Sequence, residues 1–470
     1  MINSEFEGFL EGVLPDFRIE KRVEKVMNDM LNFGKAVVNK FCNSTTDKIG
    51  AYRMFGNSTF DYTDLAQGLY KSCKNNQSAH HLLCLQDTTE FNFTHHLNRI
   101  GKDDKDIGPV TRNDNAGFFC HPMLIIDPEK SFPIGISSLE LWNRSWDKKS
   151  CKERNYRDLP ISQKESYRWV DSAQRTKSLL TNTAVLTIIG DRESDIYSEL
   201  ALVPDNQTHL LIRSSINRRI FKSEQKLFEV LANSEKKSQY TLEIKGNKKR
   251  KNRIANLDLR YTKVKIQKPN RKNIEDLPLY VELWAIEARE NDNSVPIGEN
   301  PILWRLLTTH SIDSNQDAMK YIEWYSNRWI IEELFRVLKS KGLEIESSQL
   351  ESGAALKKLV VLSLQVALKT MMLKLSLKSK YQINADVMLT NQQIQFINII
   401  TKEVEGSTQK QKNPHINGTL PWAAWSIARL SGWSGYASQG PPGYISIKSG
   451  LDIFYSKYEG YKLAIKYLKL

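Results

Sequence analysis

The sequence has 470 residues, a net charge of +13 and 40% hydrophobic residues. Its length excludes a single small binding module and favours about two to four domains, because domains usually hold roughly 100–200 residues. No uninterrupted apolar run approaches the roughly 18 residues that a membrane span needs, and the amino-terminal residues carry acids in place of a secretory signal. We therefore expect a cytoplasmic protein with no membrane partner. The five cysteines form no CxxC pair, so we expect reduced thiols.

The positive charge is concentrated in one stretch of the chain. Residues 209–272 hold 19 Lys and Arg against 5 Asp and Glu, and the rest of the chain is close to neutral. The densest part, residues 245–253, separates two alternating segments, 239–245 and 254–268, which predict β-strands joined by a turn. Two interpretations stay open, a solvated face that keeps the protein soluble and a surface that contacts phosphates. The contacting side chains would be Lys248, Lys249, Arg250 and Lys251.

Helical and strand patterns follow one another along the chain. Residues 1–70 have helical periodicity, with an amphipathic stretch over 17–41 that is compatible with a DNA-binding head or a plain helical cap. From residue 80, short apolar runs alternate with helical segments, which predicts an α/β core. The basic β segment is interpreted as an insertion into that core, because another strand, residues 301–309, follows it. Beyond residue 352 the pattern is helical again.

Three of the apolar runs end in an aspartate, Asp87, Asp127 and Asp191, and of these Asp87 and Asp191 are the candidates for chemistry. The carboxyl ends of buried strands are where open α/β sheets usually place their chemistry. Phosphoryl transfer on DNA often uses two Mg²⁺ ions, which prefer oxygen ligands from several elements. Because Asp also favours turns, two such residues alone are weak evidence, and a third acid from another element is needed.

The segment around Glu332 supplies a third acid. With the helical spacing of about 100° per residue, Tyr325, Arg328, Glu332 and Lys339 share one face about 60° wide of a single predicted helix. Their neighbours are apolar, which indicates an embedded helix. The polar face is interpreted either as part of a catalytic site or as an internal ion-pair network of Arg328 with Glu332.

These residues resemble a known family. Tyr325-x2-Arg328-x3-Glu332-x6-Lys339 matches the YREK signature of insertion-sequence-four DDE transposases, the group that contains the transposon Tn-five enzyme. LQDTTEFNF and IIGDRESDIYSEL are similar to the segments that carry the family's first and second aspartates. HLLIRSS with Arg213 resembles the strand that follows. GAYRMFGN with Arg53, and LPDFRIEKR with Arg18 and Arg22, resemble its amino-terminal DNA-binding segments.

The resemblance implies a fold and its division into domains. We expect an α/β RNase H-like catalytic core over residues 71–370, with a basic β insertion at about 215–300. A helical DNA-binding domain over residues 1–70 would precede it. A helical dimerisation or interaction region over residues 371–470 would follow it, with a homodimer in a synaptic complex.

The resemblance also implies the site. Asp87, Asp191 and Glu332 would be the catalytic, metal-binding triad, with two Mg²⁺ ions that Mn²⁺ replaces. Trp304 corresponds to a tryptophan that receives a flipped base, although a tryptophan in an apolar strand is usually part of the core. The other expected DNA contacts are Tyr325, Arg328, Lys339, Arg213, Arg18, Arg22, Arg53 and the basic cluster 248–251.

The expected reaction is cut-and-paste transposition on double-stranded DNA. It would comprise nicking at the terminal inverted repeats of the element, hairpin formation and opening, and strand transfer into target DNA. Two alternatives stay open. One is an RNase H-like nuclease such as a junction resolvase, and the other is a non-catalytic protein that binds element ends and regulates transposition.

Overall fold

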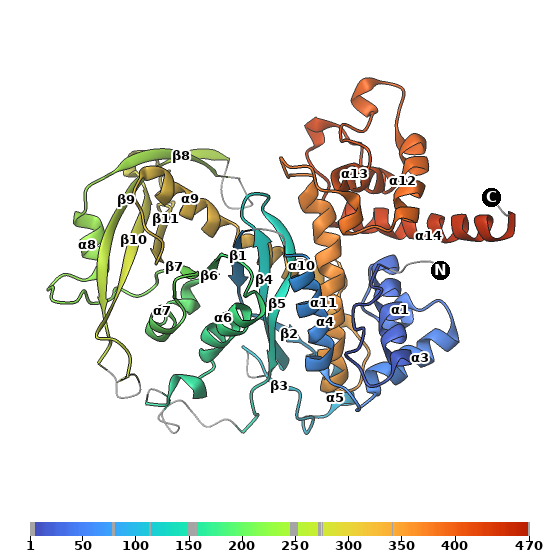
Figure 1. The fold of residues 1–470 in the computed structure, drawn as a ribbon, viewed down its shortest axis with the longest axis horizontal. Helices are drawn as coiled ribbons and strands as arrows, with labels where there is room; N and C mark the ends of the chain where they lie inside the picture. The colour runs from blue at the N-terminus through green and yellow to red at the C-terminus, as the bar shows by residue number, and fades with distance from the viewer. Residues whose placement is uncertain are drawn as a thin grey trace. The chain divides into compact units, whose positions relative to one another are not determined.

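The computed structural model describes residues 5–77, 80–111, 114–147, 156, 158–244, 252–270, 274, 276–340 and 342–468. The contacts within the chain divide it into two compact units (Figure 1). The first unit comprises Met1–Gln77, Thr88–Lys148 and Ile330–Leu470, and the second comprises Ser78–Asp87 and Lys149–Trp329.

The second unit contains a mixed β-sheet. Three neighbouring strands are parallel, with β6 between β1 and β7. From β7 the sheet continues antiparallel through β11, β10, β9 and β8. A mixed sheet with helices fits the α/β, RNase H-like class that is expected from the sequence. The strands are β1 (His81–Gln86), β6 (Val185–Gly190), β7 (Thr208–Arg213), β8 (Ser238–Ile244), β9 (Arg253–Gln267), β10 (Tyr280–Glu290) and β11 (Leu303–Thr308).

Burial explains the strand patterns of this sheet. In β1 and β6 five of six residues are buried, as expected for strands covered on both faces. In β9 buried and exposed residues largely alternate, so the two predicted strands β8 and β9 are confirmed. The turn predicted between them falls on residues 245–251, which lie outside the described residues. The helices of this unit are α6 (Tyr167–Leu179), α7 (Tyr197–Leu202), α8 (Leu227–Asn233) and α9 (Asn315–Ser326).

The first unit begins with the predicted helices, and antiparallel strands follow. Among these, β4 pairs with β2, β3 and β5, and α4 packs on β5. The helices are α1 (Phe17–Phe33), α2 (Val38–Phe41), α3 (Thr45–Gly56), α4 (Tyr62–Asn75) and α5 (Leu97–Ile100). The strands are β2 (Thr89–Asn92), β3 (Gly108–Pro109), β4 (Ala116–Asp127) and β5 (Phe132–Trp142).

Helix α11 (Gly353–Ser376) forms the centre of the first unit. It contacts α1, α3, α4, α13 and α14, and most of its residues are buried. The sequence predicts no segment that could cross a membrane, yet this helix is long and apolar enough to do so. However, 83% of its most apolar window is buried inside the protein, as in a core helix. The remaining helices of the unit are α10 (Trp329–Leu338), α12 (Asn391–Val404), α13 (Leu420–Leu430) and α14 (Tyr444–Leu468).

The single helix predicted across residues 325–339 is wrong. Helix α9 ends at Ser326 and α10 begins at Trp329. At the break the N–H groups of Asn327 and Arg328 donate to carbonyls three residues back, those of Trp324 and Tyr325, each over 3.1 Å. These tighter turns replace the α-helical pattern. The four polar residues therefore do not share one helical face, and only Glu332 lies within α10.

Four cysteines, Cys42, Cys73, Cys84 and Cys120, are free and buried, in agreement with the expected reduced thiols. Burial raises the pKa of Cys42 to about 11 and that of Cys73 to about 12. Such thiols are inert because the thiolate is the reactive form. They act as small core residues.

Candidate active site

Asp87 and Asp191 follow the ends of two neighbouring parallel strands. Leu85 of β1 pairs with Ile189 of β6, and each aspartate lies two residues beyond its paired residue. The register therefore brings both carboxylates to the same edge of the sheet. Both aspartates are partly buried. This arrangement matches the prediction that the two acids stand together at a carboxyl edge.

Local backbone structure positions Asp191. Its carboxylate accepts a hydrogen bond from the N–H of Glu193 over 2.8 Å and caps a short 3-10 helix, η3 (Arg192–Ser194). The preceding residue, Gly190, leaves no room for a side chain, because a Cβ atom there would lie 2.2 Å from the Ser194 Oγ. The close turn after β6 thus depends on glycine and directs Asp191 out of the strand.

Three of the predicted DNA-contacting residues lie beside these acids in the second unit. Arg328 forms an ion pair with Asp87, with Nη1 2.9 Å from Oδ2. Tyr325, at the end of α9, is buried; burial raises the pKa of its hydroxyl, whereas Arg328 and Arg213 lower it and Asp191 raises it. Burial lowers the pKa of Arg213, on β7. The structure therefore brings Asp87, Asp191, Tyr325, Arg328 and Arg213 together.

Glu332 and Lys339 belong to the first unit. Glu332 lies in the first turn of α10. The Lys339 ammonium donates to the backbone oxygen of Glu90, lies 3.9 Å from the Glu346 carboxylate, and is 5.4 Å from the centre of the Phe91 ring. Lys339 is thus held against β2 by protein groups.

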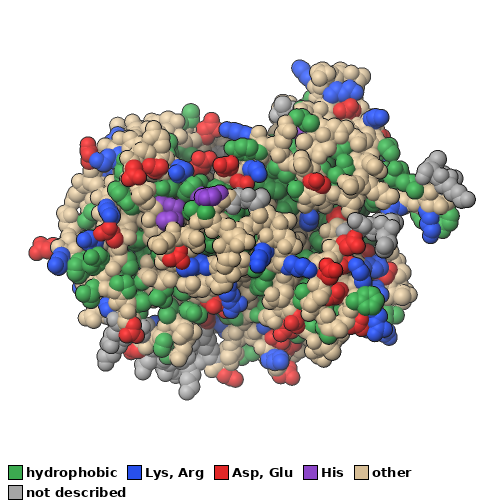
Figure 2. Space-filling view, in the orientation of Figure 1, with side chains coloured by type: hydrophobic (Ala, Val, Ile, Leu, Met, Phe, Trp, Pro, Cys, Tyr) green, Lys and Arg blue, Asp and Glu red, His purple; other side chains and the backbone are tan. Residues whose placement is uncertain are grey.

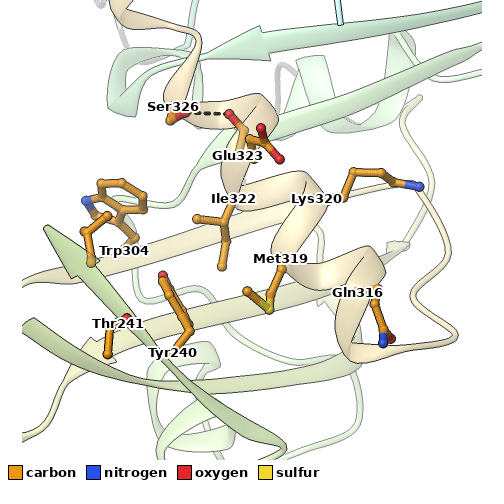
Figure 3. A pocket seen from close by; sticks show the side chains of 10 residues that line it. Tyr240, Thr241, Trp304, Gln316, Met319, Lys320, Ile322, Glu323 and Ser326 are labelled. Carbon is orange, nitrogen blue, oxygen red and sulfur yellow. Dashed lines mark hydrogen bonds between the residues drawn. The ribbon is translucent and has the colours of Figure 1, made fainter. Parts of the chain in front are cut away.

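Trp304 lines a pocket of about 470 Å³ in the second unit (Figure 3). It lies on β11 opposite Ala288 of β10, and its side chain is only partly buried. The ring meets Tyr325 edge-on at 6.4 Å between centres. A tryptophan on a strand is usually part of the core, whereas Trp304 is only partly buried and lines a pocket. The rest of the pocket is formed by Tyr240, Thr241 and Leu242 of β8 and by Gln316, Met319, Lys320, Ile322, Glu323 and Ser326 of α9.

The basic stretch is partly neutralised by the neighbouring strand. Glu282, Glu287 and Glu290 of β10 lie beyond the basic stretch 209–272, yet each carboxylate is close to a basic side chain of β9. Arg253 pairs with Glu290, Arg260 lies 3.9 Å from Glu287, and Lys263 pairs with Glu282.

The net charge of the stretch therefore overstates the positive charge that its strands expose. The four-residue cluster Lys248, Lys249, Arg250 and Lys251 lies outside the described residues. On the face drawn in Figure 2, Lys and Arg side chains are interspersed with Asp and Glu side chains.

The amino-terminal arginines differ in their surroundings. Arg18 lies in the first turn of α1, is 80% exposed and pairs with the capping residue Asp16 at 2.8 Å. Arg22 is 3.3 Å from Asp47 of α3. Arg53 is exposed on α3. Arg18 and Arg53 are available at the surface, whereas Arg22 joins α1 to α3.

A buried ion pair near the site could not be predicted from the sequence. Asp195 and Arg218 are both almost fully buried and lie 2.6 Å apart. Asp195 also accepts the N–H groups of Ser215 and Ile216 at 2.8 and 3.0 Å. The pair ties the segment after Asp191 to the segment after β7. No local pattern indicates such a pairing, because the two residues belong to separate loops.

A second buried acid, Glu199 of α7, lies behind the strand ends. Burial raises the pKa of this carboxyl group to about 8, a rise that hydrogen bonds from Ser194 and Gln86 oppose. Glu199 carries no signal in the sequence, since a glutamate within a helix is usually exposed.

The chemistry of Asp87 and Asp191 fits a divalent metal ion, because Mg²⁺ prefers carboxylate oxygens and these two carboxylates share one edge of the sheet. Within the described parts of the chain, no three His, Cys, Asp or Glu side chains form a group that could hold a metal ion. The described geometry therefore supports two metal ligands, Asp87 and Asp191.

Residues 176–368 match the family model described as a transposase DDE domain. This match supports a transposase of the DDE family. The matched segment contains Asp191 and Glu332, together with Trp304 and the YREK residues, whereas Asp87 precedes it. A DDE transposase domain implies DNA binding and nuclease or phosphoryl-transfer chemistry, for which such domains generally use divalent metal ions.

Proposed function

We propose that this chain catalyses cut-and-paste transposition of an element flanked by terminal inverted repeats. The single observation that carries the proposal is the paired position of Asp87 and Asp191 at the ends of β1 and β6, in a chain that matches a transposase DDE domain. Asp87, Asp191 and Glu332 are proposed to hold two Mg²⁺ ions, for which Mn²⁺ substitutes. When bound, the ions would lower the pKa of attacking water and stabilise charge on the phosphate.

Arg213, Arg328, Tyr325 and Lys339 are proposed to hold the DNA end. Arg213 and Arg328 bring positive charge to the strand edge, and Arg matches phosphate through its planar fork. Tyr325 contributes a hydroxyl from α9, and Lys339 a further cation. In this arrangement one phosphodiester is oriented for in-line attack, which is the main contribution a protein makes to phosphoryl transfer.

The proposed reaction sequence balances without an external energy source. Water first attacks the phosphorus at the element end; its proton leaves, the bond to the 3′ oxygen breaks, and a 3′ hydroxyl is released. That hydroxyl attacks the opposite strand and gives a hairpin, which a second water opens. The new 3′ hydroxyl then attacks target DNA. Each transesterification exchanges one phosphodiester for another.

Trp304 is proposed to accept a base during hairpin formation. A tight turn of one strand unstacks a base at a cost of about a few kcal/mol, and an aromatic surface offsets this cost by stacking. The pocket of about 470 Å³ beside the Trp304 ring offers such a surface.

Two other proposals follow from the resemblance. The chain would act in the cytoplasm as a homodimer in a synaptic complex, with a helical DNA-binding domain over residues 1–70 and a dimerisation region over residues 371–470. The catalytic domain would span residues 71–370 with a basic insertion at about 215–300.

The experiment is a time course on end-labelled DNA that carries the sequences flanking the gene, in which the short inverted repeats are to be sought. Mg²⁺-dependent nicks, followed by hairpins and joined products, are expected. Nicks without hairpins or joining would identify a simple nuclease such as a resolvase. Binding without any cleavage would identify a regulator of transposition.

A further inference from the structure

Glu199 connects the segments that carry the two candidate catalytic aspartates. One of its carboxylate oxygens accepts a hydrogen bond from Gln86 Nε2 over 2.8 Å, and the other accepts one from Ser194 Oγ over 2.7 Å. Gln86 is the last residue of β1, directly before Asp87. Ser194 ends the 3-10 turn that Asp191 caps. A single side chain thus links both strand ends.

The connection is buried and closely packed. Gln86, Ser194 and Glu199 are each 0% exposed, so solvent cannot replace a lost partner without a structural change. The Oε1 atom of Gln86 is buried with no hydrogen-bond partner within the described part of the chain, which leaves Glu199 to orient this amide. Because the Ser194 N–H donates to the Asp191 backbone oxygen over 3.2 Å, a shift of Ser194 is passed to Asp191.

We propose that Glu199 is a positioning residue that sets the distance and orientation of Asp87 relative to Asp191, and through them the metal affinity of the site. The inference rests on the proposed function, since it takes these two aspartates as metal ligands. Partners that orient metal ligands commonly determine affinity as strongly as the geometry of the ligands themselves. A carboxyl group suits this position because its two oxygens reach hydrogen-bond partners on two segments at once.

Four variants separate this role from a general contribution to folding. Glu199→Ala and Gln86→Leu remove the link, whereas Glu199→Gln keeps the size of the side chain and an oxygen that accepts from Gln86. Glu290→Gln is the matched control, because Glu290 is also a buried carboxylate of the second unit. It accepts from the Ile302 N–H over 3.0 Å and pairs with Arg253.

Each protein is bound to an element-end DNA. Mn²⁺ affinity is measured from the electron paramagnetic resonance signal of free Mn²⁺, alongside the DNA dissociation constant, the nicking rate and a thermal melt. Glu199→Ala and Gln86→Leu are expected to weaken Mn²⁺ binding by about 10–100-fold, with unchanged DNA affinity. Glu199→Gln is expected to stay near the wild type, and Glu290→Gln to change only the melting temperature.

Wild-type Mn²⁺ affinity in Glu199→Ala, with only a lower melting temperature, would overturn the inference. An equal loss of Mn²⁺ affinity in Glu199→Gln and Glu199→Ala would also overturn the inference, because the charge of Glu199, and not its hydrogen bonds to Gln86 and Ser194, would then determine the affinity. A wild-type protein that binds Mn²⁺ but never nicks would instead overturn the proposed function, while a Glu199-dependent Mn²⁺ affinity would leave the positioning role standing.

Discussion

Arg328 and Asp87 form an ion pair whose side chains are only 11% and 17% exposed. The pair places a guanidinium directly against one of the two aspartates at the carboxyl edge of the sheet. Arg328 is therefore positioned to contact a phosphate held beside Asp87. In the proposed site the same charge would oppose a divalent cation at Asp87, so Arg328 would affect both DNA binding and metal binding.

Arg328→Ala is expected to weaken binding to the element end and to slow nicking. Arg328→Lys should retain only part of the DNA affinity and of the nicking rate. Lysine keeps the charge but lacks the planar fork that binds a phosphate through two hydrogen bonds. Fluorescence anisotropy and a nicking assay measure the two effects. An Arg328→Ala protein that binds and nicks as the wild type does would assign the ion pair a purely structural role.

Trp304→Ala is expected to leave the first nick nearly normal and to slow hairpin formation, since base stacking contributes about 1–3 kcal/mol per base. Denaturing gels of end-labelled DNA follow both steps, and DNA with an abasic site at the flipped position should respond differently from intact DNA. Trp284→Ala is the matched control, because Trp284 is also partly buried and lies on the adjacent strand.

A core role for Trp304 predicts a different outcome. Truncation would then cost about 3–5 kcal/mol of stability and depress binding, nicking and hairpin formation together. A mutant that melts, nicks and forms hairpins at the wild-type rate would leave Trp304 with no role at the DNA end.

Neutralising Lys248, Lys249, Arg250 and Lys251 is expected to weaken DNA binding and flatten its salt dependence. Each lost phosphate contact should reduce the slope of log K against log salt by roughly 0.9. Lys263→Gln is the control, because Lys263 already pairs with Glu282 and its loss should change the slope less. A slope that stays at the wild-type value would show that the cluster only keeps the protein soluble.

The lowered pKa of His310 predicts that the folded protein loses stability in acid. It hydrogen-bonds Thr187 Oγ1 over 2.7 Å and stacks on His209 with ring centres 3.9 Å apart. Burial, followed by the neighbouring His209 and His81, lowers the pKa of His310 from 6.5 to about 2. Between pH 6.5 and about pH 2, the unfolded chain therefore binds a proton at His310 that the folded chain does not bind.

Stability should consequently fall as the pH falls below about 6.5, by up to about 1.4 kcal/mol per pH unit. Urea unfolding between pH 7 and pH 4 measures this dependence. His310→Gln removes the titrating group and should flatten the curve. An equally steep curve in that variant would assign the acid sensitivity to other groups.

The strand ends could be predicted from the sequence because β1 and β6 are short apolar runs closed by aspartate. The parallel register that aligns Asp87 with Asp191 is a long-range pairing, and only the structure shows it. The Glu199 link was missed for the same reason, since Gln86 and Glu199 lie far apart in the chain.

The helix break at Asn327 and Arg328 could not be predicted, because neither glycine nor proline marks it and the surrounding periodicity is helical. The partial neutralisation of the basic stretch could not be predicted, because the partner carboxylates Glu282, Glu287 and Glu290 lie on β10, beyond residues 209–272. Local charge counts omit cross-strand pairs.

The most direct test of the account is Mg²⁺-dependent nicking by Asp87→Ala, Asp191→Ala and Glu332→Ala. Each variant is predicted to lose nicking while it still binds the element end, and double variants should be hardly worse than singles, because a metal site acts as a unit. Asp205→Asn, which alters a loop carboxylate paired with Lys177, should nick normally. Normal nicking by any one of the three alanine variants would remove that residue from the site and contradict the triad.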